Sequence, residues 1–151
     1  MTLVFGSDHA GFDLRTHLAG WAREQGHTVK EVGAMSLDSY DYPEAADQVV
    51  EEVLGRSAEF GVLVCGTGIG VCIRANRYVG IRAAECTSVE MAHLARQHNH
   101  ANVLCLGGRI LSRELGESIL QAFLQTPEDD AERHAKRVRM LDGDLACGTQ
   151  E

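Results

Sequence analysis

The sequence predicts a doubly wound α/β fold with five parallel strands, and three observations support this prediction. Short apolar runs alternate with amphipathic segments from one end of the chain to the other. Such alternation of strand and helix is typical of parallel βαβ units. Glycine and polar residues follow several of the apolar runs, at the strand ends where such sheets bind ligands. The chain has 151 residues and no internal repeat or long linker, so we expect one domain over residues 1–151.

The first half of the chain is expected to contain three strands and two helices. The strands are the apolar runs at residues 3–5, 27–32 and 60–64. A helix that closes at Gly26 is predicted by apolar residues at helical spacing, namely Leu14, Leu18, Trp21 and Ala22. The second helix is expected to open at Tyr42-Pro43, because proline suits the first helical turn. Its apolar side contains Val49, Val50, Val53 and Leu54.

The second half continues the alternation. Glycine-rich residues 66–70 predict a turn into a short helix through Asn76, and further strands are expected at residues 80–84 and 102–106. Two longer helices are predicted by apolar lines, the first through Met91, Leu94, Ala95 and His98, the second through Leu115, Ile119, Ala122 and Phe123. The acidic stretch at residues 127–132 suits a helix start, so we expect a last helix at about 127–141.

Composition argues against several classes of function. The chain carries 14 basic and 22 acidic residues, a formal net charge of −8, which is unfavourable for general nucleic-acid binding. No apolar run approaches the ~20 residues that span a bilayer, and the first residues lack the pattern of a secretory signal. The 5 cysteines are odd in number and include no CxxC pair, as is typical of reduced thiols. We therefore expect a soluble cytoplasmic protein that binds neither membranes nor nucleic acid.

Two loops at predicted strand ends carry groups suited to acid–base chemistry. Asp8 and His9 are adjacent in a glycine-bounded loop, where they can bind hydroxyls and shuttle protons; the alternative is that Ser7 or Asp8 caps the next helix beside an incidental histidine. Cys65 opens the glycine-rich turn, whose backbone N–H groups can approach an oxyanion. The helix that begins there favours a thiolate. The turn is neither a GxGxxG dinucleotide pattern, because residue 71 is valine, nor a Walker A loop.

Two histidines end the predicted helix before the fifth strand. His98 lies on the apolar line of that helix, so we expect it to point inward or into a cleft. The carboxyl end of a helix favours a protonated imidazole, which suits a proton donor. The alternative is a capping histidine followed by Asn99 in the left-handed conformation. No acidic or cysteine ligands accompany His98 and His100, so we expect no metal site.

Three arginines are suited to binding phosphate. Arg109 follows the fifth strand after two glycines. Arg133 and Arg137 are four residues apart on one face of the last helix, where they are either solvated or clamp a phosphate. Together with the thiol, the histidines and Asp8, these side chains suit proton abstraction next to the carbonyl of a small phosphorylated substrate, without a redox cofactor.

The chain resembles the ribose-5-phosphate isomerase B family in seven blocks, which follow in this order: GSDHAG, DYPE, VCGTGIG, IRAN, GIRA, ARQHNHANVLCLGGR and ERHAKRV. The resemblance extends from about residue 4 to residue 138. It implies a Rossmann-like three-layer α/β/α sandwich. It also implies a homodimer, or a tetramer, whose active sites are shared between subunits, because the last helix reaches across the subunit boundary to the neighbouring site. It also implies a metal-independent and cofactor-free aldose–ketose isomerisation of the pentose phosphate pathway, between ribose 5-phosphate and ribulose 5-phosphate, through a cis-enediolate.

The resemblance also implies roles for single residues. Cys65 would be the base that moves the proton between C1 and C2, in the branch of the family that uses a cysteine and not a glutamate. His98 would open the furanose ring with help from Asp8, and Thr67 would support proton handling. The backbone donors for the enediolate would come from Gly66, Thr67, Gly68, Ile69 and Gly70. The phosphate would be bound by His9, Arg109, Arg133 and Arg137, and the site would also be lined by Tyr42 and Asn99.

The sequence leaves three alternatives open. An allose-6-phosphate or galactose-6-phosphate isomerase of the same family needs only a slightly longer pocket, and such preferences depend on contacts worth ~1–3 kcal/mol. A dinucleotide-dependent oxidoreductase would need GxGxxG after the first strand, where this chain has GSDHAG. A non-catalytic module that binds sugar phosphates is disfavoured by the presence of Cys65, His98 and Asp8 together.

Overall fold

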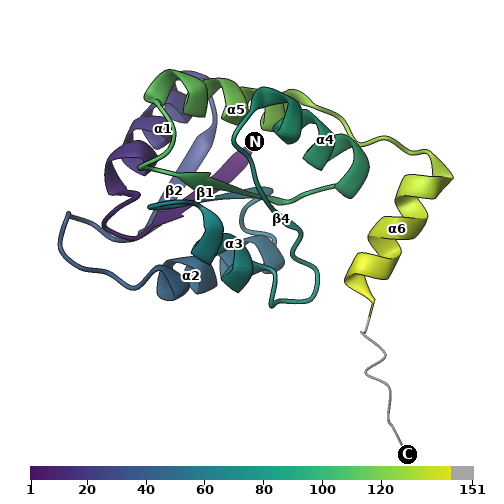
Figure 1. Ribbon diagram of the computed structural model, residues 1–151, viewed down its shortest axis with the longest axis horizontal. Helices are drawn as coiled ribbons and strands as arrows, with labels where there is room; N and C mark the ends of the chain where they lie inside the picture. The colour runs from purple at the N-terminus through teal and green to yellow at the C-terminus, as the bar shows by residue number, and fades with distance from the viewer. Residues whose placement is uncertain (144–151) are drawn as a thin grey trace, which may run out of the picture.

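The computed structural model describes residues 1–143, which form a three-layer α/β/α sandwich (Figure 1). The strands are β1 (Thr2–Ser7), β2 (Thr28–Gly33), β3 (Phe60–Cys65), β4 (Ala83–Glu85) and β5 (Val103–Gly107). The helices are α1 (Phe12–Glu24), α2 (Tyr42–Leu54), α3 (Ile69–Ala75), α4 (Val89–Asn99), α5 (Arg113–Gln125) and α6 (Glu132–Asp142). All strand pairs are parallel, in the order β2-β1-β3-β5-β4, which confirms the predicted doubly wound sheet. Cys147, for which the sequence suggests no role, lies outside the described residues.

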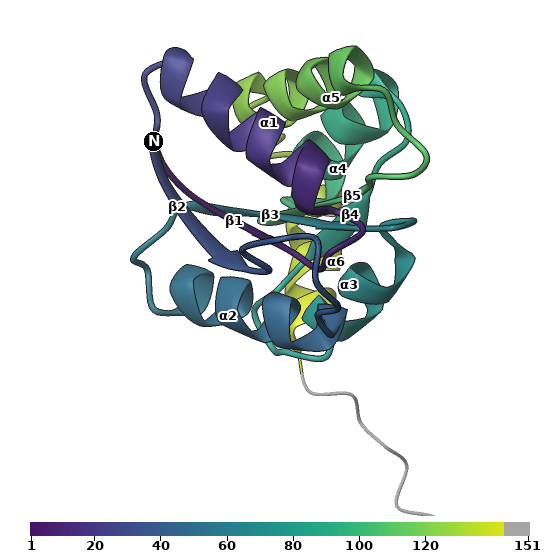
Figure 2. The same ribbon diagram turned by 90° about the vertical axis from the view of Figure 1, so that its left-hand side faces the viewer.

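The central strands alternate their side chains between two cores. Leu3 and Phe5 of β1 pack with side chains of α1, α4 and α5, whereas Val4 packs with side chains of α2 and α3. Figure 2 shows these two groups of helices on opposite faces of the sheet. Strands β1, β3 and β5 are almost entirely buried, as is usual for a parallel sheet that is covered on both faces. No helix in residues 1–143 is both long and apolar enough to cross a bilayer.

The strand order brings the loops after β1, β3 and β5 together at one edge of the sheet. The backbone N–H of Gly108 donates to the carbonyl oxygen of Cys65 at 2.7 Å, and that of Arg109 donates to Gly66 at 3.0 Å. Gly11 packs against β3 so closely that a Cβ there would lie 2.1 Å from the carbonyl oxygen of Val64. The three loops therefore form one tightly packed unit at the carboxyl ends of the strands.

The fourth strand is Ala83–Glu85, so the prediction of residues 80–84 was wrong by several residues. Gly80 has a φ of 88°, in the left-handed region, and cannot belong to an extended strand. The Asn102 side chain accepts the N–H of Arg82 and donates to the carbonyl oxygen of Gly80, both at 2.8 Å. This side chain bonds residues 80 and 82 outside the strand ladder, and only the shorter segment that follows pairs with β5 as a strand.

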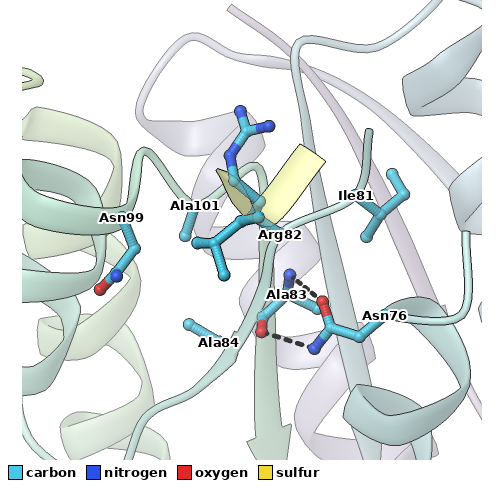
Figure 3. A pocket seen from close by; sticks show the side chains of 8 residues that line it. Asn76, Ile81, Arg82, Ala83, Ala84, Asn99 and Ala101 are labelled. Carbon is cyan, nitrogen blue, oxygen red and sulfur yellow. Dashed lines mark hydrogen bonds between the residues drawn. The ribbon is translucent and has the colours of Figure 1, made fainter. Parts of the chain in front are cut away.

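The outer edge of β4 is covered by a side chain. The amide group of Asn76, at the end of α3, accepts the N–H of Ala83 at 2.8 Å and donates to its carbonyl oxygen at 2.9 Å (Figure 3). Both backbone groups of Ala83 that face away from β5 are therefore bonded within the same chain.

The last helix begins at Glu132, so the predicted start at residue 127 was also wrong. The backbone N–H of Asp129 donates to the carbonyl oxygen of Gln97 at 3.1 Å, and the Asp129 carboxylate accepts the N–H of Ala131 at 2.9 Å. These bonds hold residues 127–131 in a non-helical path along the end of α4. Helix α6 then lies outside the two helix layers (Figure 1), and its far end is held by Arg82, whose Nη1 donates to both Asp142 oxygens at 2.8 and 2.6 Å.

Candidate active site

A cavity of about 430 Å³ opens where the loops after β1 and β3 meet. It is lined by Asp8, Tyr42, Cys65, Gly66, Thr67, Ile69, Gly70 and Ile73. All of these except Ile73 were predicted as site residues. The structure therefore brings the aspartate loop and the cysteine turn together at the expected edge of the sheet.

The thiol of Cys65 lies on the floor of this cavity. Cys65 is the last residue of β3 and is 4% exposed, and its Sγ accepts the backbone N–H of Gly68 at 3.2 Å. Gly68 has a φ of 84°, and a Cβ there would lie 2.9 Å from the carbonyl carbon of Leu106. This position therefore requires glycine, and the turn aims a backbone donor where it can stabilise negative charge on the sulfur.

Asp8 and His9 are fixed by bonds to the backbone. The buried carboxylate of Asp8 accepts the N–H of Gly11 at 2.9 Å, in the turn that precedes α1. Nδ1 of His9 accepts the backbone N–H of Tyr40 at 3.1 Å, so that Nε2 carries the proton when the ring is neutral. Gly11, and not Ser7 or Asp8, is the N-cap of α1, so the predicted alternative of a direct side-chain cap is wrong.

Tyr42 and Arg109 border the cavity. The Tyr42 ring lies against the Cα of Gly70, where a Cβ would be 2.7 Å from ring atoms. Arg109 is exposed, and its side chain passes over Gly66, with Nη1 3.5 Å from the position of a Cβ. The exposed Thr67 accepts the N–H of Ile69 on its hydroxyl at 3.3 Å. The cavity lining therefore combines polar groups with the apolar side chains of Ile69 and Ile73.

Helix α3, which begins directly after the cysteine turn, is clamped to α2. Arg74 donates from Nε and Nη2 to the two carboxylate oxygens of Asp47 at 2.7 and 3.0 Å. The Tyr78 hydroxyl donates to the same carboxylate at 2.7 Å. The hydrogen bond from Arg74 is the main reason that the pKa of Asp47 lies below its ordinary value. The clamp fixes the helix that forms one wall of the cavity.

Three other cysteines in the described residues differ from Cys65. Burial raises the pKa of Cys86 to about 12, and it raises that of Cys105 well above the ordinary thiol value. Cys72 is half-buried, and a hydrogen bond with Cys105 lowers its pKa. Cys86 and Cys105 therefore act as small core residues, as expected for buried thiols.

The remaining predicted residues do not line the cavity above Cys65. Asn99 instead lines a second cavity of about 370 Å³, together with Asn76, Ile81, Arg82, Ala83, Ala84, Ala101 and Leu141 (Figure 3). Arg133 and Arg137 are exposed on α6. His100 has a φ of 48° and ends α4, so the predicted alternative that Asn99 is the left-handed residue is wrong.

His98 is half-buried and stacks on His134, a residue for which the sequence predicts no role. The ring centroids are 4.3 Å apart, with an interplanar angle of 6°. His134 is buried in α6, and its Nε2 lies 3.5 Å from a carboxylate oxygen of Asp129. Burial lowers the pKa of His134, and the nearby His98 lowers it further. The only signal in the sequence was the position of His134 directly after Arg133 in the block ERHAKRV.

No metal site was predicted. Within residues 1–143, no group of three or more His, Cys, Asp or Glu side chains is placed to hold a metal ion.

Comparison with known proteins gives a consistent result. The family described as Ribose/Galactose Isomerase matches residues 3–141. Ribose-5-phosphate isomerase B of Escherichia coli is 40% identical over 139 residues, which cover 92% of this chain and 93% of that protein. The solved structure of a ribose 5-phosphate isomerase from Thermotoga maritima superposes with a TM-score of 0.91 at 45% identity, over 93% of this chain and 97% of the other. Type B ribose 5-phosphate isomerase of Trypanosoma brucei gives a TM-score of 0.90 at 40% identity, over 93% and 96%.

Proposed function

The chain belongs to the ribose/galactose isomerase family, and we propose that it interconverts ribose 5-phosphate and ribulose 5-phosphate. The observation that carries the proposal is the Cys65 thiol, which lies in one cavity with Asp8 and accepts a backbone N–H from Gly68. The choice of a pentose phosphate is supported by the relatives in Escherichia coli and Thermotoga maritima, which are named for ribose 5-phosphate.

Cys65 is the base in the proposed reaction. As a thiolate, it removes the C2 proton of the open-chain aldose, and the negative charge passes to O1, which forms a cis-enediolate. The thiol then returns this proton, or a deuteron that it has exchanged with solvent, to C1, while O1 takes up the proton that O2 releases as C2 becomes the carbonyl of the ketose. The reaction is an internal transfer of hydrogen, so it needs no redox cofactor. Backbone N–H groups of residues 66–70 stabilise the enediolate, and one such donor is worth ~3 kcal/mol at the transition state. Thr67 supports the proton transfers between oxygens.

The proposed site is shared between two copies of the chain. His9 and Arg109 bind the phosphate from the subunit that carries Cys65. Arg133 and Arg137 bind it from the other subunit, and His98 and Asn99 accompany them. Two observations support this arrangement. These four side chains do not line the Cys65 cavity of their own chain, and α6 lies outside the two helix layers.

Exposed apolar side chains also support a homodimer. Ile69 and Ile73 on the wall of the cavity are 50% and 55% exposed, and Met140 and Leu141 on α6 are 69% and 60% exposed. Large apolar side chains at the rim of a polar site are typical of a protein interface. A second copy that covers α3 would bury Ile69 and Ile73 and bring arginines to the phosphate end of the cavity.

Metal independence is part of the proposal, because the thiol supplies the base and the backbone N–H groups supply the oxyanion stabilisation. A cytoplasmic location is proposed as well. It is supported by Cys65, Cys72, Cys86 and Cys105, which are all unpaired and persist most readily in a reducing compartment.

A substrate panel in deuterated water tests the function. The protein is incubated with ribose 5-phosphate, allose 6-phosphate or galactose 6-phosphate, each with and without EDTA. We expect the fastest turnover with ribose 5-phosphate, deuterium at C2 of recovered substrate, and no effect of EDTA. Faster turnover of either hexose phosphate would assign the chain to that branch of its family. A lack of turnover with all three would contradict an isomerase function, and loss of activity in EDTA would contradict the metal-free mechanism.

A further inference from the structure

His134 packs against His98, the proposed ring-opening acid, and has no role in the proposed reaction. His134 of α6 and His98 of α4 are parallel within 6° at a centroid distance of 4.3 Å. His134 is 5% exposed and His98 is half-buried, so His134 forms the inner and His98 the outer ring of the pair. A stack of this geometry restricts rotation of the His98 ring and thereby fixes the direction of its nitrogens.

We propose that His134 is a positioning residue for His98, which holds the His98 ring in the orientation that ring opening requires. This inference rests on the proposed function, because it assigns His98 the task of protonating the ring oxygen of the cyclic aldose. His134 itself is not expected to contact the substrate.

The charges around the stack support this assignment. The groups that influence the inner ring are His98 on α4, Asp129 in the segment before α6, and Arg133 and Arg137 on α6. Burial, His98 and the two arginines all lower the pKa of His134, and Asp129 opposes them. His134 therefore remains neutral at pH 7. A neutral inner ring packs flat against His98 without the repulsion that two imidazolium rings would have at this distance.

The ring-opening step can show whether His134 positions His98 or only stabilises the fold. Ribose 5-phosphate is mostly a furanose, so it must be opened before the C2 proton can be removed. Ribulose 5-phosphate cannot form the corresponding ring, because its O5 carries the phosphate. Exchange of its C1 proton with solvent deuterium therefore requires the base and the phosphate site, but not the ring-opening acid.

The test compares these two reactions in His134→Ala and in His134→Phe, which keeps a flat ring but has no nitrogen. For His134→Ala we expect kcat/KM with ribose 5-phosphate to fall ~10-fold or more, because a misplaced group costs rate steeply. Deuterium exchange at C1 of ribulose 5-phosphate should change by less than about twofold. The matched control is His93→Ala, which removes another α4 histidine whose Nδ1 bonds the Thr126 hydroxyl at 2.5 Å. It should leave both reactions unchanged.

An equal loss in both reactions would overturn the inference, because it would show that His134 only holds α6 in place. The chemical shifts of the His98 ring protons, followed by NMR, provide a readout that does not depend on activity, because a stacked aromatic ring displaces them. We expect this displacement in the wild-type chain, its retention in His134→Phe and its loss in His134→Ala. Identical shifts in the wild-type chain and His134→Ala would also overturn the inference. If the wild-type chain failed to isomerise ribose 5-phosphate, the proposed function would be wrong, and the chemical shifts would still decide whether His134 holds the His98 ring.

Discussion

The backbone N–H of Gly68 donates to the Cys65 sulfur at 3.2 Å, from a residue with a φ of 84°. The proposed base and one of its stabilising donors therefore belong to the same turn, separated by two residues. Any change in the turn alters both at once. The loop after β5 is bonded to this turn through the Cys65 carbonyl oxygen, so the geometry of the base also depends on the neighbouring strand.

Replacement of Cys65 tests the base directly. Cys65→Ala should lower kcat ~10²–10⁴-fold, the usual contribution of a positioned acid or base. Cys65→Ser keeps the size of the side chain but lacks a readily ionised group, so it should lose almost as much activity. Because Cys65 also packs in the core beneath α2 and α3, thermal unfolding of both variants separates a loss of chemistry from a loss of stability. Near-normal turnover of Cys65→Ala in a continuous ketose assay would contradict the assignment.

Gly68→Ala should damage both the fold and the reaction. The left-handed backbone costs an alanine ~1–2 kcal/mol, and the contact of its Cβ with Leu106 adds to this. Urea unfolding should therefore show a loss of at least ~1 kcal/mol, together with reduced turnover. Gly20→Ala is the control, because a Cβ at Gly20 in α1 meets nothing within 4 Å. That variant should gain up to ~1 kcal/mol. Equal stability of the two variants would show that the turn is not strained.

Subunit complementation tests whether the site is shared. Cys65→Ala and Arg137→Ala should each be nearly inactive as purified homodimers. When the two are mixed and allowed to exchange subunits, each heterodimer should contain one intact site, with Cys65 from one chain and Arg137 from the other. Activity should then recover to about a quarter of the wild-type value, because about half of the dimers are mixed and each has one working site of two. No recovery after verified exchange would place both residues in the same subunit's site.

The Asp47 clamp should make stability depend on pH in a defined direction. The pKa of Asp47 is lowered in the folded chain, so its ion pair stabilises the fold above the unfolded-state value of ~3.9 and is lost as pH falls below it. Asp47→Asn should reduce the free energy of unfolding by ~1 kcal/mol at pH 7, a modest figure because the pair is partly exposed. The difference from wild type should shrink as the pH falls below ~3.9. A difference that stays constant from pH 7 to pH 3 would contradict the role of the charge.

The order of strands and helices was predictable because each element has a clear apolar period and most end at glycine or a polar cap. The two element boundaries that were predicted wrongly share a different cause. Residues 80–82 bond the side chain of Asn102, and the backbone N–H of Asp129 donates to the carbonyl oxygen of Gln97. These bonds are made between segments that are distant along the chain, so local apolar spacing carries no information about them.

The candidate site was predictable only in part, for a related reason. Asp8 and Cys65 follow adjacent parallel strands, and this topology alone brings them to one edge of the sheet. The positions of His98 and Arg137 depend on the path of residues 127–131, which no local pattern describes, and their proposed place in a shared site would depend on a second copy of the chain. The stack of His134 on His98 joins two helices across 35 intervening residues, and the sequence contains no periodicity that links them.

The amide of Asn76 on the edge of β4 has a consequence for how the protein can assemble. In a parallel strand of three residues, only Ala83 and Glu85 turn their backbone groups away from β5. The first is already occupied by Asn76, and the second carries a charged side chain. An incoming strand therefore finds no continuous row of free backbone groups at β4, and the sheet ends at this strand. Copies of this chain cannot extend the sheet at this edge, which protects β4 from the edge-to-edge strand pairing that leads to aggregates.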